Sequence, residues 1–111
     1  MIAVYLSGTG NTKHCLELLL QTMQEPCEMV SMGDEKAGEK VLEQDMVILA
    51  YPTQFSNLPF MVRTFIKENA AGWRGTKVFC LSTMGLFSGD ATGCAARLLR
   101  KYGARVIGGL Q

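Results

Sequence analysis

Three short segments of this 111-residue chain are apolar on both faces, and they constrain the fold more than any other feature. They are Ile2–Leu6 (IAVYL), Met46–Tyr51 (MVILAY) and Lys77–Ser82 (KVFCLS). A strand with one face in water alternates apolar and polar residues, whereas a central parallel strand is covered by helices above and below. We therefore predict buried parallel strands here, and two more strands at Glu28–Met32 and Ala104–Leu110.

Amphipathic segments lie between these strands. Apolar residues recur at helical spacing in Thr12–Gln24, in the segment that begins at Pro59, and in Asp90–Tyr102. Their apolar positions are Leu16, Leu19, Leu20 and Met23; Met61, Val62, Phe65 and Ile66; and Ala95, Leu98, Leu99 and Tyr102. Gly103 suits the left-handed residue that closes a helix. The polar segment 34–44 predicts a short, weakly anchored helix.

Strands and helices thus alternate from the first strand to the fifth. This order is typical of an α/β domain in which right-handed crossovers place helices on both faces of a parallel sheet. We expect one domain over residues 1–111, with no closing helix after the fifth strand. One sheet face should then be under-covered, so we expect either a piece of a longer protein or another chain over the gap.

Composition excludes several classes of protein. Hydrophobic residues make up 48% and charged residues 19%, which suits a packed core rather than a disordered chain. The net charge of +1 gives no basic excess for nucleic acid. No apolar run approaches the roughly 20 residues of a membrane span, and Ile2–Leu6 is too short for a signal peptide. We expect a cytoplasmic protein.

The cysteines and the single histidine do not form a metal or catalytic motif. Cys15, Cys27, Cys80 and Cys94 include no CxxC pair, so neither a zinc site nor an iron–sulfur cluster is indicated. All four lie in or beside apolar segments, and we expect buried thiols. We interpret His14 as a solvent-facing helix residue, and with one histidine no hydrolase triad can be built.

The strongest functional signal is the loop between the first strand and the first helix. It reads SGTGNT and comprises Ser7, Gly8, Thr9, Gly10, Asn11 and Thr12. Its glycines allow close backbone approach, its hydroxyls and amide donate hydrogen bonds, and the helix N-terminus behind it favours anions. It matches neither the P-loop nor the GxGxxG dinucleotide motif. It predicts a phosphate site; the alternative is a turn that only caps the helix.

Two more polar loops follow the third and fourth strands. The carboxyl ends of the first, third and fourth strands meet at one sheet edge in a doubly wound fold, where ligands bind. A pocket for a flat, phosphorylated ring is therefore predicted; the alternative is two ordinary surface connections with Phe55 and Phe87 in the core. The candidate residues are Pro52, Thr53, Gln54, Phe55, Ser56 and Asn57, and Thr83, Met84, Gly85, Leu86, Phe87, Gly89 and Asp90.

These three loops resemble those of flavodoxins, and the resemblance covers essentially the whole chain. It is strongest to the flavodoxin-like half of bacterial proteins fused to a ferredoxin domain with two [4Fe–4S] clusters. It implies a flavodoxin-type doubly wound sheet of order 2-1-3-4-5 that lacks its final helix. It also implies non-covalent FMN, with residues 7–12 on the phosphate and residues 52–57 and 83–90 beside the isoalloxazine.

The resemblance also implies the function and the partners. We expect an electron carrier that meets redox proteins such as a ferredoxin domain or another iron–sulfur protein, with a second copy of the chain as one cover for the open sheet face. Typical flavodoxins are strongly acidic and stack the ring between Trp and Tyr; this chain departs from both patterns, and Trp73 reads as structural. The alternatives are an FMN-dependent NAD(P)H reductase and a non-redox module that binds a phosphate ligand.

Overall fold

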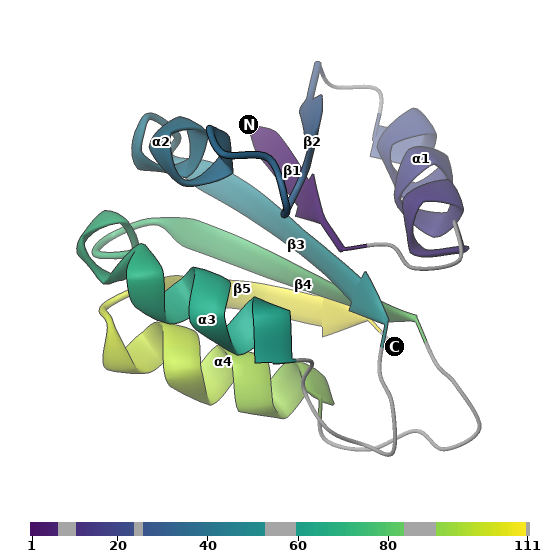
Figure 1. Cartoon of the computed structure of the whole chain (residues 1–111). Helices are drawn as coiled ribbons and strands as arrows, with labels where there is room; N and C mark the ends of the chain where they lie inside the picture. Colours follow the sequence, from purple (N-terminus) through teal and green to yellow (C-terminus); the bar gives the residue numbers. More distant parts are fainter. Residues whose placement is uncertain (7–10, 24–25, 53–59, 84–90, 111) are drawn as a thin grey trace.

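The computed structural model describes residues 1–6, 11–23, 26–52, 60–83 and 91–110. These residues form a five-stranded, all-parallel sheet of order β2-β1-β3-β4-β5, which confirms the predicted order (Figure 1). The strands are β1 (Ile2–Tyr5), β2 (Glu28–Ser31), β3 (Met46–Pro52), β4 (Lys77–Thr83) and β5 (Arg105–Leu110). Each lies within one residue of its expected boundaries at either end.

Helices cover the two faces of the sheet unequally. They are α1 (Asn11–Met23), α2 (Ala37–Leu42), α3 (Phe60–Glu68) and α4 (Ala91–Lys101), with a short 3-10 helix η1 (Ala70–Gly72). Figure 1 shows α1 on one face and α2, α3 and α4 on the other. Within the described part of the chain α1 thus covers its face alone, and Phe79 of β4 is only partly buried against the apolar cluster there. The expected thin cover of one face is confirmed.

Side-chain alternation along β3 explains why the central strands are apolar throughout. Val47, Leu49 and Tyr51 belong to the larger core cluster, which α2, α3 and α4 complete. Ile48 and Ala50 belong to the smaller cluster, which α1 completes through Leu16 and its neighbours. Because successive side chains of a strand point to opposite faces, a strand between two helical layers needs apolar residues at every position.

Trp73 is a structural residue, as predicted. It is fully buried after η1, and its indole Nε1 donates a hydrogen bond to the Ile66 carbonyl oxygen at 2.8 Å. Its ring meets that of Phe65 edge-on, with 6.2 Å between centroids. Trp73 therefore joins the end of α3 to the start of β4 through both an apolar contact and a polar one.

Two predicted burials are wrong. Met61 is 48% exposed and Cys15 is exposed, although we placed Met61 on an apolar stripe and expected buried thiols. Helical residues advance about 100° each, and in both cases the next residue, Val62 or Leu16, takes the buried direction. Cys27 is half-buried and Cys80 is buried, while the side chain of Cys94 lies outside the described residues.

The helix ends and the weak second helix match the expectations from sequence. Gly103 has φ 88° and closes α4 in the left-handed conformation. In the short helix α2, only Ala37 and Val41 are buried, and Leu42 is exposed. His14 is exposed, as interpreted from the sequence. No helix among the described residues is long and apolar enough to cross a membrane.

Candidate functional site at the carboxyl edge of the sheet

The ends of β1, β3 and β4 lie side by side at one edge of the sheet. Tyr5 at the end of β1 is in register with Ala50, and the Leu6 N–H donates to the Ala50 carbonyl oxygen at 2.9 Å. Pro52 at the end of β3 is in register with Thr83 at the end of β4. The three predicted loops therefore leave the sheet from adjacent strands, as the doubly wound arrangement requires.

The first turn of α1 has the chemistry of an anion site. The helix begins at Asn11, and Thr12 is only 2% exposed. The first turn carries no acidic residue, and Lys13 holds its Nζ 5.8 Å from the centre of the Tyr5 ring. Unpaired backbone N–H groups and the helix dipole favour negative charge at such a position. An anion at this edge would thus meet N–H donors and a lysine, with no carboxylate in that turn to repel it.

One buried hydroxyl at this edge lacks a hydrogen-bond partner. The Ser82 Oγ is buried and unpaired in the described part of the structure, one residue before the end of β4. A buried hydroxyl without a partner is costly, so native proteins usually satisfy it with protein, water or ligand. Ser82 begins the polar segment STMGLFSGD that the sequence indicated after the fourth strand, but it was not among the predicted site residues.

The neighbouring thiol of Cys80 is buried. Burial raises the pKa of Cys80 from 9.0 to about 11, and a hydrogen bond with Tyr51 opposes this shift only in part. Because the thiolate is the nucleophile, this thiol is protonated at neutral pH. Among the described residues, no group of three His, Cys, Asp or Glu side chains could hold a metal ion.

We predict that Cys80 resists alkylation in the native protein. At pH 8 iodoacetamide should modify Cys80 about 100-fold more slowly in the native than in the unfolded chain, because its pKa is two units higher. Peptide mass mapping measures this, and exposed Cys15 is the internal control. Native-state labelling of Cys80 at the unfolded rate would contradict it. The native state holds the Cys80 proton more tightly than the unfolded chain does. The resulting stabilisation of the native state is complete below pH 9 and is lost as the pH rises to about 11.

The described residues include only part of the predicted site. Asn11, Thr12, Pro52 and Thr83 lie at the shared edge, at the first turn of α1 and at the ends of β3 and β4. The structure thus brings together the strand ends from which the predicted loops leave the sheet. The other predicted residues lie outside the described residues: Ser7, Gly8, Thr9, Gly10, Thr53, Gln54, Phe55, Ser56, Asn57, Met84, Gly85, Leu86, Phe87, Gly89 and Asp90.

The family model and the solved structures that match this chain point to the same family. A family model described as "Flavodoxin domain" matches residues 2–103. The structure of two-electron reduced Megasphaera elsdenii flavodoxin matches with TM-score 0.81 and 26% identity, over 98% of this chain and 83% of that one. A flavodoxin from the domain Archaea matches with TM-score 0.82 and 23% identity, over 98% and 80% of the two chains.

A third solved structure is Fusobacterium nucleatum flavodoxin bound to flavin mononucleotide. It matches with TM-score 0.75 and 14% identity, over 96% of this chain and 68% of that one. At such identities the archaeal and fusobacterial matches show a shared fold. No curated protein sequence matches the chain.

Proposed function

Because the chain belongs to the flavodoxin family, with the family match spanning residues 2–103, we propose that it binds FMN and carries electrons between redox proteins. The observation that carries this proposal is the position of the α1 N-terminus. A helix start without carboxylates follows β1, at the edge where β3 and β4 also end. A phosphate grip and two flanking loops at one edge suit a phosphorylated ring.

Residues 7–12 are proposed to hold the FMN phosphate. The described members, Asn11 and Thr12, supply helix N–H groups and a hydroxyl, and Lys13 adds a positive charge beside them. Hydrogen bonds between these groups and a dianion are charge-assisted and about twice as strong as neutral ones. The phosphate should therefore contribute a large share of the affinity.

Residues 52–57 and 83–90 are proposed to lie beside the isoalloxazine. Pro52 and Thr83 are in register, so the two loops start from neighbouring backbone positions. The free Ser82 hydroxyl fits a ligand at this edge, since a bound polar group or a water held by it would satisfy the Oγ atom.

In this proposed role, the chain's own residues bind and orient the cofactor. When bound, FMN supplies one- or two-electron transfer, and the protein's part is to bind it, orient it and exclude water. Tyr51 and Cys80 are buried below this edge, within the apolar core. We propose a carrier rather than a substrate-specific enzyme, a role that the family match supports.

FMN titration of the purified apoprotein tests the proposal. We expect quenching of flavin fluorescence at 1:1 stoichiometry and retention of yellow colour after gel filtration. Riboflavin, which lacks the phosphate, should bind about 100-fold more weakly or worse, because several charge-assisted hydrogen bonds are lost. No quenching by FMN would overturn the proposal. Steady NAD(P)H oxidation with a quinone acceptor would favour the reductase alternative.

Several finer expectations stay predictions. They are that residues 1–111 form one FMN-binding domain, that the protein is cytoplasmic, and that its partner is a ferredoxin domain or another iron–sulfur protein. A second copy over the α1 face of the sheet is also untested; sedimentation of the purified chain measures it directly.

A further inference from the structure

One buried hydroxyl at the carboxyl edge of the sheet indicates a contact that the described protein groups do not supply. Ser82 is 2% exposed, and its Oγ atom has no hydrogen-bond partner among the described residues. It lies on β4, one residue before the strand ends at Thr83. Burying a hydroxyl without a partner costs free energy, and native proteins seldom leave one in that state. A polar group that approaches this edge would complete the environment of Ser82.

Ser82 lies on the face of the sheet that α2, α3 and α4 cover. Cys80 belongs to the core cluster on that face, and Leu81 belongs to the cluster under α1. Successive side chains of a strand point to opposite faces, so Ser82 shares the face of Cys80. Tyr51 of β3 is in register with Ser82 and belongs to the same cluster as Cys80. Ser82 and Tyr51 are therefore neighbours on one face, and Cys80 lies two residues further from the edge.

The polar neighbours of Ser82 on this face are bonded to each other. A hydrogen bond joins the Cys80 thiol and Tyr51. The helices over this face contribute apolar residues to the same cluster, among them Val62 and Ala95. A buried water needs about two to four polar partners, so these surroundings suit a water poorly. A ligand that enters from the edge brings its own polar atoms and does not depend on such partners.

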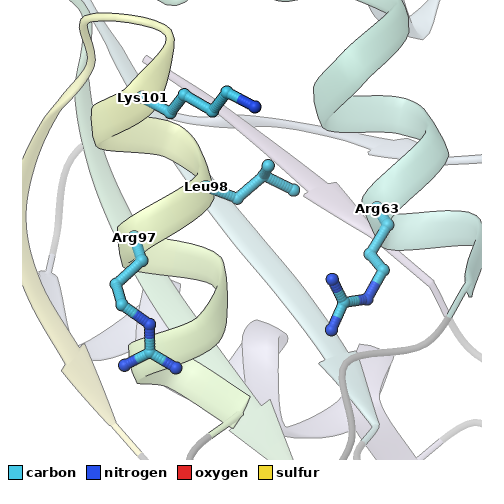
Figure 2. Close-up of a pocket in the computed structure, with 4 residues that line it drawn as sticks. All are labelled: Arg63, Arg97, Leu98 and Lys101. Carbon is cyan, nitrogen blue, oxygen red and sulfur yellow. The ribbon is translucent and has the colours of Figure 1, made fainter.

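The pocket between α3 and α4 is a separate feature. It has a volume of about 330 Å³ and is lined by Arg63, Arg97, Leu98 and Lys101 (Figure 2). Ser82 is not among these lining residues, and Arg97 already has an interaction partner within the chain. A molecule in that pocket would contact the side chains of the two helices and not the Ser82 hydroxyl. The partner of Ser82 is therefore to be sought at the edge of the sheet.

Ser82 also lies apart from the proposed phosphate site. In the order β2-β1-β3-β4-β5, β4 is two strands from β1, the strand that precedes α1. Neighbouring strands are about 4.8 Å apart, so the ends of β1 and β4 are separated by about 10 Å. Helix α1 also covers the opposite face of the sheet (Figure 1). A phosphate at the first turn of α1 would not reach Ser82, whereas FMN as a whole is long enough to span that separation.

We propose that Ser82 contacts the ring or the ribityl chain of FMN, and that its hydroxyl destabilises the apoprotein while it stabilises the complex. This inference rests on the proposed function. A hydroxyl donates and accepts hydrogen bonds, so it suits the carbonyl oxygens and the N–H group of the ring as well as the ribityl hydroxyls. In the complex the Oγ atom would gain the hydrogen bond that the described residues do not give it.

Ser82→Ala tests both parts of the proposal. Alanine has no polar side-chain atom, so the urea midpoint of the apoprotein should rise by about 0.5–1 M when the unsatisfied hydroxyl is removed. The Kd of FMN should rise about tenfold, because one hydrogen bond is lost. The Kd of riboflavin should rise by the same factor, because the contact does not involve the phosphate. Urea unfolding followed by circular dichroism measures the midpoint, and flavin fluorescence titration measures both Kd values.

Thr76→Val is the matched control, since it removes a buried hydroxyl that does have a partner. Thr76 is 6% exposed, and its Oγ1 donates to the Gly72 carbonyl oxygen at 2.9 Å. It directly precedes β4, at the edge of the sheet opposite to that of Ser82. Thr76→Val should lower the urea midpoint and leave the affinities for both flavins unchanged. The two variants should thus shift the stability of the apoprotein in opposite directions.

The proposal requires both shifts of Ser82→Ala. Unchanged affinity for the two flavins would overturn it. A midpoint that falls or stays the same would also overturn it, because the hydroxyl would then have a partner, such as a water, without the ligand. Weaker binding of FMN with unchanged binding of riboflavin would place the contact at the phosphate, again against the proposal.

The parent chain separates this inference from the proposed function. If the parent chain binds neither flavin, the proposed function fails, and the role of Ser82 fails with it. If the parent chain binds both flavins and Ser82→Ala binds them equally well, the role of Ser82 alone fails.

Discussion

Replacing Trp73 with alanine is expected to lower the free energy of unfolding by about 3–5 kcal/mol, the usual cost of removing a large buried aromatic side chain. Trp73 is fully buried, and its ring packs edge-on against Phe65. The substitution also leaves the Ile66 carbonyl without the indole donor. Since domains of this size are stable by about 5–15 kcal/mol, much of the total would be lost.

Urea unfolding followed by far-UV circular dichroism measures this change, because Trp73 is the only tryptophan and fluorescence would be lost. Trp73→Phe retains most of the apolar volume and should cost less than Trp73→Ala. Phe60→Ala truncates an aromatic residue that is 83% exposed, and it should stay within about 0.5 kcal/mol of the parent. A Trp73→Ala loss no larger than that of Phe60→Ala would show that the indole is not part of the core.

Replacing Thr12 with valine is expected to weaken FMN binding about ten- to hundredfold, the effect of losing one hydrogen bond to a charged group. Valine is nearly the same shape as threonine but has no hydroxyl. Thr12 is 2% exposed in the first turn of α1, so the change removes a polar contact at the proposed phosphate site with little change in packing. Fluorescence titration with FMN measures it.

Thr22→Val is the matched control, since it makes the same change in the last turn of α1. Its hydroxyl donates to the Leu18 carbonyl oxygen at 3.0 Å in an exposed position, far along the helix from Asn11. It should leave FMN affinity unchanged. Riboflavin binding should be insensitive to Thr12→Val, because riboflavin carries no phosphate. Equal losses for FMN and riboflavin would place the effect in the fold rather than at the phosphate.

The inner strands could be predicted because burial on both faces requires a continuous run of apolar residues. Ile2–Tyr5, Met46–Pro52 and Lys77–Thr83 are the three inner strands of the sheet, and each was expected from its continuous apolar run. The helices followed from 3.6-residue spacing. The errors at Met61 and Cys15 came from positions adjacent to a buried residue, where spacing alone does not set the width of the apolar stripe.

The candidate site was predictable only in its components. The residue types of the loop at 7–12 and the alternation of strands and helices pointed to a phosphate site at the sheet edge. Ser82 was left out of the predicted site residues, because a hydroxyl at the end of a buried strand stands out only once its lack of a hydrogen-bond partner is known. The pocket lined by Arg63, Arg97, Leu98 and Lys101 was not predicted either, since α3 and α4 are distant in sequence and lie side by side only in the folded chain.

Local pattern by itself determined the elements and their order, and it predicted an anion-binding turn, because these depend on the periodicity and chemistry of neighbouring residues. Tertiary structure alone decided which strand ends share an edge and, among the described residues, which sheet face is covered by α1 alone. Those outcomes depend on how the crossover connections bring together residues that are far apart in sequence. The spacing of neighbouring residues does not specify such contacts.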